Sequence, residues 1–513
     1  MYATAAHAQT FAGGERENYL RYLQTVQLAP LYPWGARAFS AREVDYLESD
    51  GRPSAHLPIR PSAHLEWFPL SGSIRYNSTF PYGFNDGAVW AGKGATLALD
   101  GGFMLRRGVL SLTVAPLAFV AQNARFPLMG GSFADGSIGG VIDRPQRFGN
   151  GSYARLDPGQ STLRLDWHAL AAGVSTANEY WGPATDFPII LGNNAPGFPH
   201  AFFGTAHPVK LGPIAVHGRL IWGTLAQSAF SAETLAGGKR FATGIVLDLT
   251  SRWVPGLEIG ATRFAHQPWR PGGPTTRDAL AMFQGSEQGL RGVNELASVF
   301  FRWVLPKSGF EVYGEYGRDD YAANLRNLLL EPDRDGGYTI GLRKVMRLER
   351  RDAPTSRFIA IRAEIQNLQL SNLAQAGPWS PFYTHGVLRQ GHTQLGQVLG
   401  SEAGPGGAGS VIAVESYSPS GRWTWSWTRM VRQQRGDSSG ATPDPNGVDV
   451  QHALAVERLQ RRGGGRYELL ARVEAVYELN RNFTYDAFDL NITIGARFGL
   501  PSPKGAARPL HQP

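Results

Sequence analysis

The segment Tyr467-Glu-Leu-Leu-Ala-Arg-Val-Glu-Ala-Val-Tyr-Glu-Leu479 alternates in character along its length. One set of alternate positions is apolar or aromatic, and the other set carries the charges of Glu468, Arg472, Glu474 and Glu478. A period of two is that of a β-strand. Soluble strands usually run for about five or six residues, whereas roughly nine to eleven are needed to cross a membrane. The segment therefore predicts a transmembrane strand with its apolar side toward lipid and its charged side toward a wet lumen.

The same alternation recurs from about residue 65 onward, and it again places charged residues such as Arg302 and Glu364 on one side. Trp423, Trp425 and Trp427 share one side of another run, which is typical of an aromatic girdle at the membrane interface. We expect an all-β chain, a large antiparallel transmembrane β-barrel of about 16–18 strands located in the cell outer membrane. The clearest further runs are 163–169, 299–305, 359–365 and 490–500.

Turn residues divide these runs into two kinds of connection. Compact, Gly-containing turns are expected at 100–102, 306–309, 418–421 and 462–465. Long irregular stretches occupy 123–160, 267–295, 318–336, 371–409 and 434–448. Outer-membrane barrels have short periplasmic turns and longer extracellular loops. The short set is therefore expected on the periplasmic side, and the long set outside or folded into the lumen.

The first part of the chain has a helical period. Tyr19, Tyr22, Leu23 and Val26 lie on one helical face, and Ser40-Ala-Arg-Glu43 is a capping-box pattern that predicts a second helix start. Ala6-His7-Ala8 is similar to a signal-peptide cleavage site. These signals predict four divisions, namely a signal-peptide remnant at 1–8, a short helical plug segment at 9–60, the barrel at 61–500 and a tail at 501–513.

Composition narrows the class of protein. The chain has 513 residues, no cysteine and a net charge of +8 spread along its length. It contains no apolar run of the roughly 20 residues that a transmembrane helix needs. No nucleic-acid recognition motif, Walker loop, dinucleotide fingerprint or metal-ligand spacing is present. We expect no nucleic-acid partner, no cofactor and no metal, and as partners outer-membrane lipid, lipopolysaccharide and the barrel-assembly machinery.

Two segments combine aromatic, amide and acidic residues in the manner of a sugar site. They are Asn85-Asp-Gly-Ala-Val-Trp90 and Asn178-Glu-Tyr-Trp-Gly-Pro183, the second followed by Asn193-Asn194. An aromatic face stacks on a sugar ring, while amides and carboxylates bond its hydroxyls. The structural alternative is equally weighted: a hairpin turn for the first segment and a rigid fold-back inside the barrel for the second.

Two later segments have the same character, Tyr316-Gly-Arg-Asp-Asp320 and Phe382-Tyr-Thr-His385 with Arg389 after it. In this order, the four segments resemble the capsule-assembly Wzi family, outer-membrane β-barrels of the lectin type. The resemblance implies a helical plug at the periplasmic mouth and binding of a surface or capsular polysaccharide. The residues then expected to contact the polysaccharide are Asn85, Asp86, Trp90, Asn178, Tyr180, Trp181, Asn193, Asn194, Tyr383, His385 and Arg389.

Two alternatives to polysaccharide binding share the predicted architecture. A sugar or solute porin differs only in having an open lumen. An outer-membrane hydrolase is the third candidate, because Gly436-Asp-Ser438-Ser-Gly440 fits the pattern G-x-S-x-G. A nucleophile elbow requires a helix after the serine, and Thr442-Pro-Asp-Pro-Asn-Gly447 forms a turn instead. We therefore expect a binding protein and not an enzyme.

Overall fold

A computed structural model describes the chain in segments, with gaps between them. The predicted remnant 1–8, the tail 501–513, Arg389 and the Gly436–Gly440 pattern all lie outside the described residues. The described ranges are 10–37, 39–48, 65–128, 148–230, 238–283, 292–319, 325–330, 332–348, 357–371, 381–385, 388, 390–433, 448–463 and 467–499.

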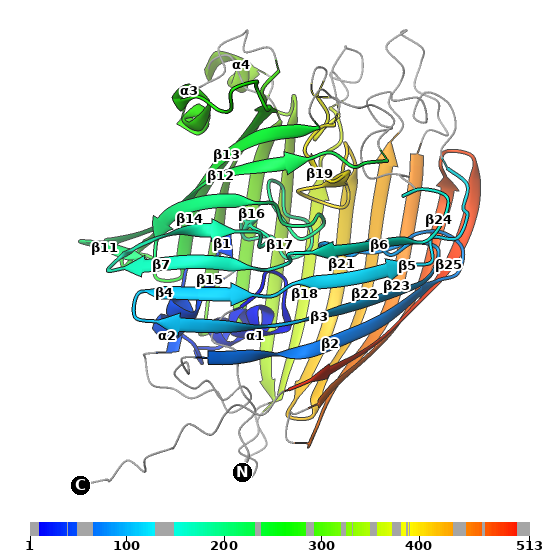
Figure 1. Ribbon diagram of the computed structural model, residues 1–513. Helices are drawn as coiled ribbons and strands as arrows, with labels where there is room; N and C mark the ends of the chain where they lie inside the picture. Colours follow the sequence, from blue (N-terminus) through cyan, green and yellow to red (C-terminus); the bar gives the residue numbers. More distant parts are fainter. Residues whose placement is uncertain are drawn as a thin grey trace.

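The described strands form one closed antiparallel barrel of 18 strands (Figure 1). Closure occurs at β2, which pairs with β3 on one side and with the last strand, β25, on the other. Three wall positions are each occupied by two successive short segments, namely β4 with β5, β6 with β7, and β10 with β11. The predicted fold class and strand count are confirmed.

The wall strands mostly follow the alternation seen in the sequence, with two corrections: the predicted run 163–169 ends at Trp167, where a tight turn begins, and the stretch 123–160 predicted as irregular contains the wall strand β6. The wall strands are β2 (Leu65–Asn77), β3 (Gly94–Arg107), β4 (Leu110–Val114), β5 (Leu117–Ala121), β6 (Tyr153–Asp157), β7 (Thr162–Trp167), β8 (Leu170–Ser175), β10 (His200–Thr205), β11 (Val209–Leu211), β12 (Ile214–Ala226), β13 (Lys239–Ser251), β14 (Leu257–Pro268), β15 (Asn294–Leu305), β16 (Phe310–Asp319), β17 (Gly336–Leu348), β18 (Arg357–Asn367), β21 (Ala408–Ser418), β22 (Gly421–Gln433), β23 (Val448–Arg462), β24 (Tyr467–Arg481) and β25 (Tyr485–Phe498).

The outer face of the barrel is apolar and the inner face is polar. Ile494 and Val299 are 63% and 58% exposed, whereas Arg302, Glu364 and Glu478 are almost fully buried inside. Apolar side chains exposed on this scale around a closed wall require a lipid environment, because water would penalise them. Among the described residues, no helix is long and apolar enough to cross a membrane.

The two ends of the barrel differ in their connections. The predicted turns 306–309 and 418–421 join β15 to β16 and β21 to β22 at one end, and are confirmed. The long connections, including those with α3 (Thr276–Ala279), the 3-10 helix η2 (Ala281–Phe283) and α4 (Leu325–Leu330), lie at the other end (Figure 1). By the rule for outer-membrane barrels, the short-turn end is periplasmic and the long-loop end is extracellular.

One predicted turn is wrong. Asp100-Gly-Gly102 lies within β3, opposite a register shift between Phe68 and Ser71 of β2. A Cβ at Gly102 would meet the carbonyl oxygen of Val114 at 1.9 Å, so glycine is required where two strands approach closely. Glycine pairs mark bulges and bends as well as turns, and the sequence pattern does not separate these cases.

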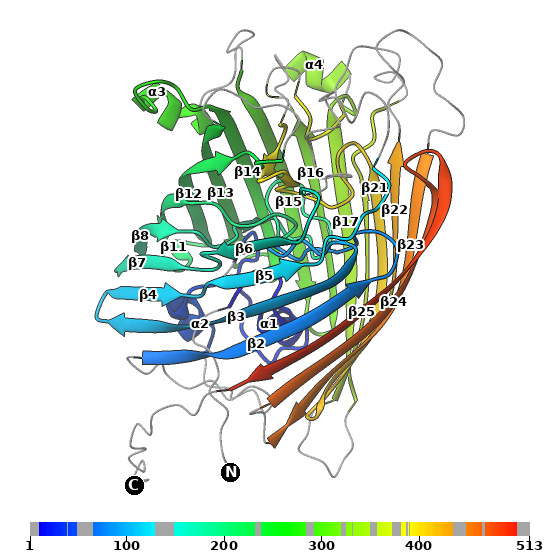
Figure 2. The same ribbon diagram turned by 45° about the vertical axis from the view of Figure 1, so that its right-hand side comes forward.

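The N-terminal helices lie inside the barrel, in its lower half (Figure 2). Helix α1 (Glu15–Thr25) is joined to the wall by an ion pair between Arg21 and Glu311 of β16 and by a hydrogen bond from Tyr22 to Glu415 of β21 (2.8 Å). Helix α2 (Ala41–Glu48) begins with the predicted capping box, because the backbone N–H of Ser40 donates to Glu43 (2.8 Å) and Ser40 Oγ accepts from the N–H of Glu43 (3.3 Å).

The carboxylate of Glu43 also joins α2 to the inner wall of the barrel. It lies 3.4 Å from His217 Nε2 and 3.9 Å from Arg164 Nη1, both on the inner wall. Burial would raise the pKa of Glu43, but the hydrogen bond from His217 and the charges of Arg164 and His217 lower this pKa to about 2. The helix therefore stays docked through an ionised carboxylate at neutral pH.

Candidate functional site

Three long connections from the extracellular end fold into the lumen, where hydrogen bonds join them to one another. They are residues 78–93, 176–199 and the described part of 381–407. The backbone N–H of Gly87 donates to the carbonyl of Asn193 (2.7 Å), and Asn193 Nδ2 donates to the carbonyl of Asn85 (3.2 Å). Asn194 Nδ2 donates to the carbonyl of Val398 (3.0 Å). The motif segments that are distant in sequence therefore meet within the barrel.

Tyr180 and Trp181 lie at the centre of this loop layer. They form β9 (Tyr180–Trp181), which pairs with β1 (Ala36–Arg37) of the N-terminal segment. The guanidinium of Arg37 lies 3.8 Å from the centre of the Tyr180 ring. Trp181 is 0% exposed, and its indole N–H donates to Glu179 Oε2 (3.0 Å). In this arrangement neither ring face of Trp181 is available to a sugar, so its contacts are structural.

Three more of the predicted residues use their polar atoms to fix the loops. Asn178 Nδ2 donates to the carbonyl of Ala195 (2.8 Å). Tyr383, which has a positive φ of 74°, donates its hydroxyl hydrogen to the carbonyl of Ile189 (2.6 Å). His385 Nδ1 accepts from the backbone N–H of Leu388 (2.9 Å). These bonds satisfy backbone groups that would otherwise be buried without partners.

Two buried ionisable side chains in the same layer, Glu179 and His392, each have a pKa far below neutral pH. Burial would raise the pKa of Glu179, but the charge of Arg219 and hydrogen bonds from His200 and Trp181 lower it to about 2. Burial lowers the pKa of His392 to about 4, although a bond to the Ile190 carbonyl partly offsets this effect. At neutral pH the loop layer therefore holds an ionised Glu179 and a neutral His392.

A cavity of about 210 Å³ lies between the loop layer and the N-terminal segment. It is lined by Asn85, Tyr180 and Asn193 from the loops, and by charged residues of β18 and β21–β24 on the wall. Asn85 has a positive φ of 53° and donates from Nδ2 to the carbonyl of Asp186 (2.8 Å). Three predicted residues, Asn85, Tyr180 and Asn193, therefore border the interior of the barrel on the side of the N-terminal helices.

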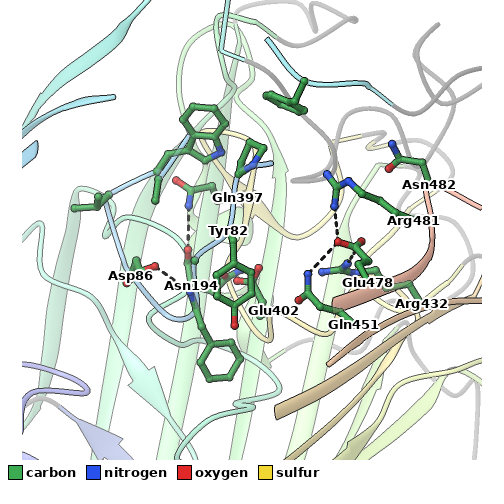
Figure 3. A pocket seen from close by; sticks show the side chains of 17 residues that line it. Tyr82, Asp86, Asn194, Gln397, Glu402, Arg432, Gln451, Glu478, Arg481 and Asn482 are labelled. Atoms are coloured by element: carbon green, nitrogen blue, oxygen red, sulfur yellow. Dashed lines mark hydrogen bonds and ion pairs between the residues drawn. The ribbon is translucent and has the colours of Figure 1, made fainter. Parts of the chain in front are cut away.

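The remaining predicted residues, Asp86, Trp90 and Asn194, line a separate pocket of about 100 Å³ (Figure 3). Its opposite wall is formed by Arg432, next to the end of β22, and Arg481, the last residue of β24. Both strands end there at extracellular connections, so the pocket lies toward the long-loop end. It is lined by Pro81, Tyr82, Gly83, Phe84, Asp86, Val89, Trp90, Ala91, Phe126, Asn194, Gln397, Glu402, Arg432, Gln451, Glu478, Arg481 and Asn482.

The loop side of the pocket is aromatic and preorganised. Trp90 is partly exposed, and its ring meets Phe148 edge-on at 4.8 Å between centroids. Asp86 pairs with Arg75, with 2.7 Å between Oδ1 and Nη2, and accepts the backbone N–H of Phe84 (2.9 Å). An aromatic face beside a fixed carboxylate provides both a stacking surface and a hydroxyl acceptor.

The strand side of the pocket is organised around Glu478 of β24. Its carboxylate accepts from Gln451 Nε2 (3.1 Å) and Arg432 Nη1 (3.2 Å), and it pairs with Arg481. Figure 3 shows these four side chains together, across the pocket from Asp86 and Asn194. Within the described chain, the buried Oε1 atoms of Gln451 and Gln397 and the buried Nε atoms of Arg432 and Arg481 have no hydrogen-bond partner. The strand side of the pocket therefore brings together a carboxylate, an amide and two guanidinium groups.

Sequence reasoning missed the strand side of the pocket. Arg432, Gln451 and Glu478 occupy inward positions of strands in which most other inward positions are also polar or charged. An inward glutamate near a strand end looks the same in sequence as any other residue that faces the lumen. Only their position at the extracellular ends of adjacent strands distinguishes them. In the described part of the chain, no group of three or more His, Cys, Asp or Glu side chains is arranged to hold a metal ion.

Taken together, a closed wall of 18 strands, an apolar outer face, and extracellular loops packed inside define an outer-membrane β-barrel. No protein-family model and no curated protein sequence matches the chain. The fold is similar to that of Wzi, an outer membrane protein involved in group 1 capsule assembly in Escherichia coli that is a carbohydrate-binding β-barrel. This alignment has a TM-score of 0.67 and 15% identity, and covers 96% of this chain and 99% of the Wzi chain.

Two further solved structures align less well. They are OccAB3 of Acinetobacter baumannii and OccK5 (OpdH) of Pseudomonas aeruginosa, with 10% and 11% identity. Each alignment has a TM-score of 0.40 and covers 84% of this chain and 98% of the other. The likeness to Wzi establishes a shared fold over nearly the whole chain, as the resemblance of the four sequence segments predicted. The set of polysaccharide-contacting residues stays a prediction.

Proposed function

We propose that this protein binds a surface or capsular polysaccharide and helps to assemble or retain it at the outer membrane. The pocket between residues 81–91 and the ends of β22–β24 supports the proposal, because it combines an aromatic face, several amides and fixed charges of both signs. Sugars are bound by this combination of stacking and hydroxyl hydrogen bonds. The shared fold with a carbohydrate-binding barrel points the same way.

In the proposed complex, Trp90 stacks on a sugar ring while Asp86 and Asn194 contact its hydroxyls. Gln451 and the two arginines held by Glu478 contact the ring from the opposite wall. The buried residues Asn178, Tyr180, Trp181, Tyr383 and His385 keep the loop layer in place, and Asn85 and Asn193 border the cavity beneath it. The protein binds without turnover, and weak contacts repeated along a polymer add up through avidity.

The test is a pull-down of purified variants on the host's own polysaccharide. Trp90→Ala removes one stacking contact, which is worth about 0.5–1.5 kcal/mol, and should weaken binding roughly two- to tenfold. Adding Gln451→Ala should weaken it further. Trp253→Ala is the matched control, because this tryptophan is 69% exposed in a periplasmic turn. Heat-modifiable migration checks that each barrel is folded. Unchanged binding by a folded Trp90→Ala, Gln451→Ala variant would contradict the proposal.

Solute passage is the second candidate function. Phe84 lines both the pocket and the cavity beneath the loop layer, so a small movement of residues 83–87 would join the two spaces. Planar-bilayer recordings separate the candidates. Large, steady single-channel conductance from the full-length protein favours passage, whereas low conductance together with glycan binding favours the lectin role.

A further inference from the structure

A second cavity, of about 630 Å³, lies on the outer wall of the barrel and not in the lumen. Its floor is a row of outward side chains that are direct cross-strand partners. The row passes from Leu112 of β4 to Leu163 of β7, Val174 of β8, Ala201 of β10 and Trp222 of β12. Leu163 and Val174 are about half exposed, as are other lipid-facing residues of the wall. We refer to this feature as the wall groove.

Several polar groups bordering the wall groove are already bonded within the protein. Thr162 and Ser175 share a hydrogen bond (2.7 Å), and Thr176 donates to the carbonyl of Gly159 (2.9 Å). Trp222 donates its indole N–H to the carbonyl of Ala279, the last residue of helix α3 (2.9 Å). A mainly apolar surface with several of its polar groups bonded internally offers little to a polar ligand and favours a hydrocarbon chain.

The extracellular end of the groove is bordered by basic side chains. Lys239 is two residues from Phe241, which lines the groove, and its carbonyl accepts from the backbone N–H of Trp269 (3.0 Å). Arg270 directly follows Trp269. Arg277 lies in α3, two residues before the carbonyl that holds Trp222.

All three cations are exposed. Among the described residues, the acidic group beside them is Asp278, which is buried, belongs to the capping box of α3 and lies 3.7 Å from Arg270. Within the described part of the chain, the basic rim formed by Lys239, Arg270 and Arg277 therefore has more positive than negative charge. Leu280 and Phe283, which follow α3 in the connection between β14 and β15, are also exposed, as is typical of a segment at the membrane interface.

We propose that the wall groove binds an acyl chain of the phosphorylated glycolipid of the outer leaflet, the lipid A part of lipopolysaccharide. Lys239, Arg270 and Arg277 hold its phosphates. Arginine and lysine bind phosphate through charge-assisted hydrogen bonds, and the groove runs from this basic rim down the lipid-facing wall. The site lies on the outside of the barrel and is independent of polysaccharide binding in the lumen-side pocket.

The experiment is native mass spectrometry of the full-length protein released from detergent micelles. Three lipids are titrated: bis-phosphorylated lipid A, the same lipid with its phosphates removed, and phosphatidylglycerol. We expect the phosphorylated lipid A to bind on the order of tenfold more tightly than either of the others. The triple variant Lys239→Gln, Arg270→Gln, Arg277→Gln should lose this preference. Ala201→Trp, which fills the middle of the groove, should weaken both forms of lipid A.

The matched control is Lys210→Gln, Arg252→Gln, Lys307→Gln, which removes three exposed cations from the periplasmic end. It should bind lipid A like the parent protein. Equal binding of the three lipids by the parent protein would overturn the proposal without any variant. Tighter binding of phosphatidylglycerol would assign the groove to a phospholipid and also overturn it. A rim variant that keeps the full preference for phosphorylated lipid A would overturn the assignment of the phosphate contacts.

Discussion

Trp181→Ala should destabilise the loop layer while leaving the pocket's affinity for glycan nearly unchanged. Trp181 has no exposed surface, and its ring packs against Gly244, where a Cβ would meet Trp181 Cη2 at 2.5 Å. It also meets the Phe264 ring at 6.2 Å between centroids and donates to Glu179. Replacing such a buried tryptophan by alanine costs about 3–5 kcal/mol, because apolar burial is lost and a cavity remains.

This cost falls on the loop layer and not on the wall, because the barrel strands keep their own ladder. A loss of about 3 kcal/mol raises the open population of the loop roughly a hundredfold. Chymotrypsin cleavage within residues 176–199 should accelerate by about that factor when opening and closing are fast compared with cleavage. Heat-modifiable migration of the barrel should change little.

Trp90→Ala is the reciprocal variant, since Trp90 is partly exposed in the pocket. It should lower glycan binding and leave the cleavage rate of residues 176–199 near that of the parent protein. The reasoning would be refuted by a Trp181→Ala protein that resists chymotrypsin like the parent protein but fails to bind the host polysaccharide. That result would indicate that Trp181 contacts the polysaccharide directly.

Three further predictions concern the plug and the wall. Arg21→Met leaves Glu311 without one of its buried partners, so the docking of α1 should weaken by about 3–5 kcal/mol and single-channel conductance should rise. Glu43 has a folded-state pKa of about 2, against about 4.3 in the unfolded chain. Its stabilisation of α2 is therefore present above pH about 4.3 and is lost as the pH falls toward about 2. The protease sensitivity of α2 should rise in that pH window, and the Glu43→Gln variant should not show this pH dependence. Gly102→Val places a side chain against a backbone carbonyl and should block barrel assembly, seen as loss of the heat-modifiable band, whereas Gly151→Val, with nothing within 4 Å of its Cβ, should assemble normally.

The sequence by itself determined the architecture of the barrel. The alternation in runs such as 467–479 decides which side of each strand faces lipid, because a one-residue slip in register would turn every charged side chain toward lipid. The capping box at Ser40 and Glu43 likewise fixed the start of α2, because it depends only on neighbouring residues. Rules of this kind depend only on residues within one segment, and the structure confirmed the strands and the helix start that they predicted.

Local rules failed at Asp100–Gly102, where the chain bends and does not turn. They also could not decide which aromatic and amide residues are accessible. Trp90 and Trp181 occur in similar Asn-, Gly- and aromatic-rich segments, but one borders the pocket and the other is fully buried. Accessibility depends on how three loops and the N-terminal helices share the lumen, which no single segment encodes. The strand side of the pocket was decided in the same way, because the closed barrel brings the ends of β22, β23 and β24 beside residues 81–91.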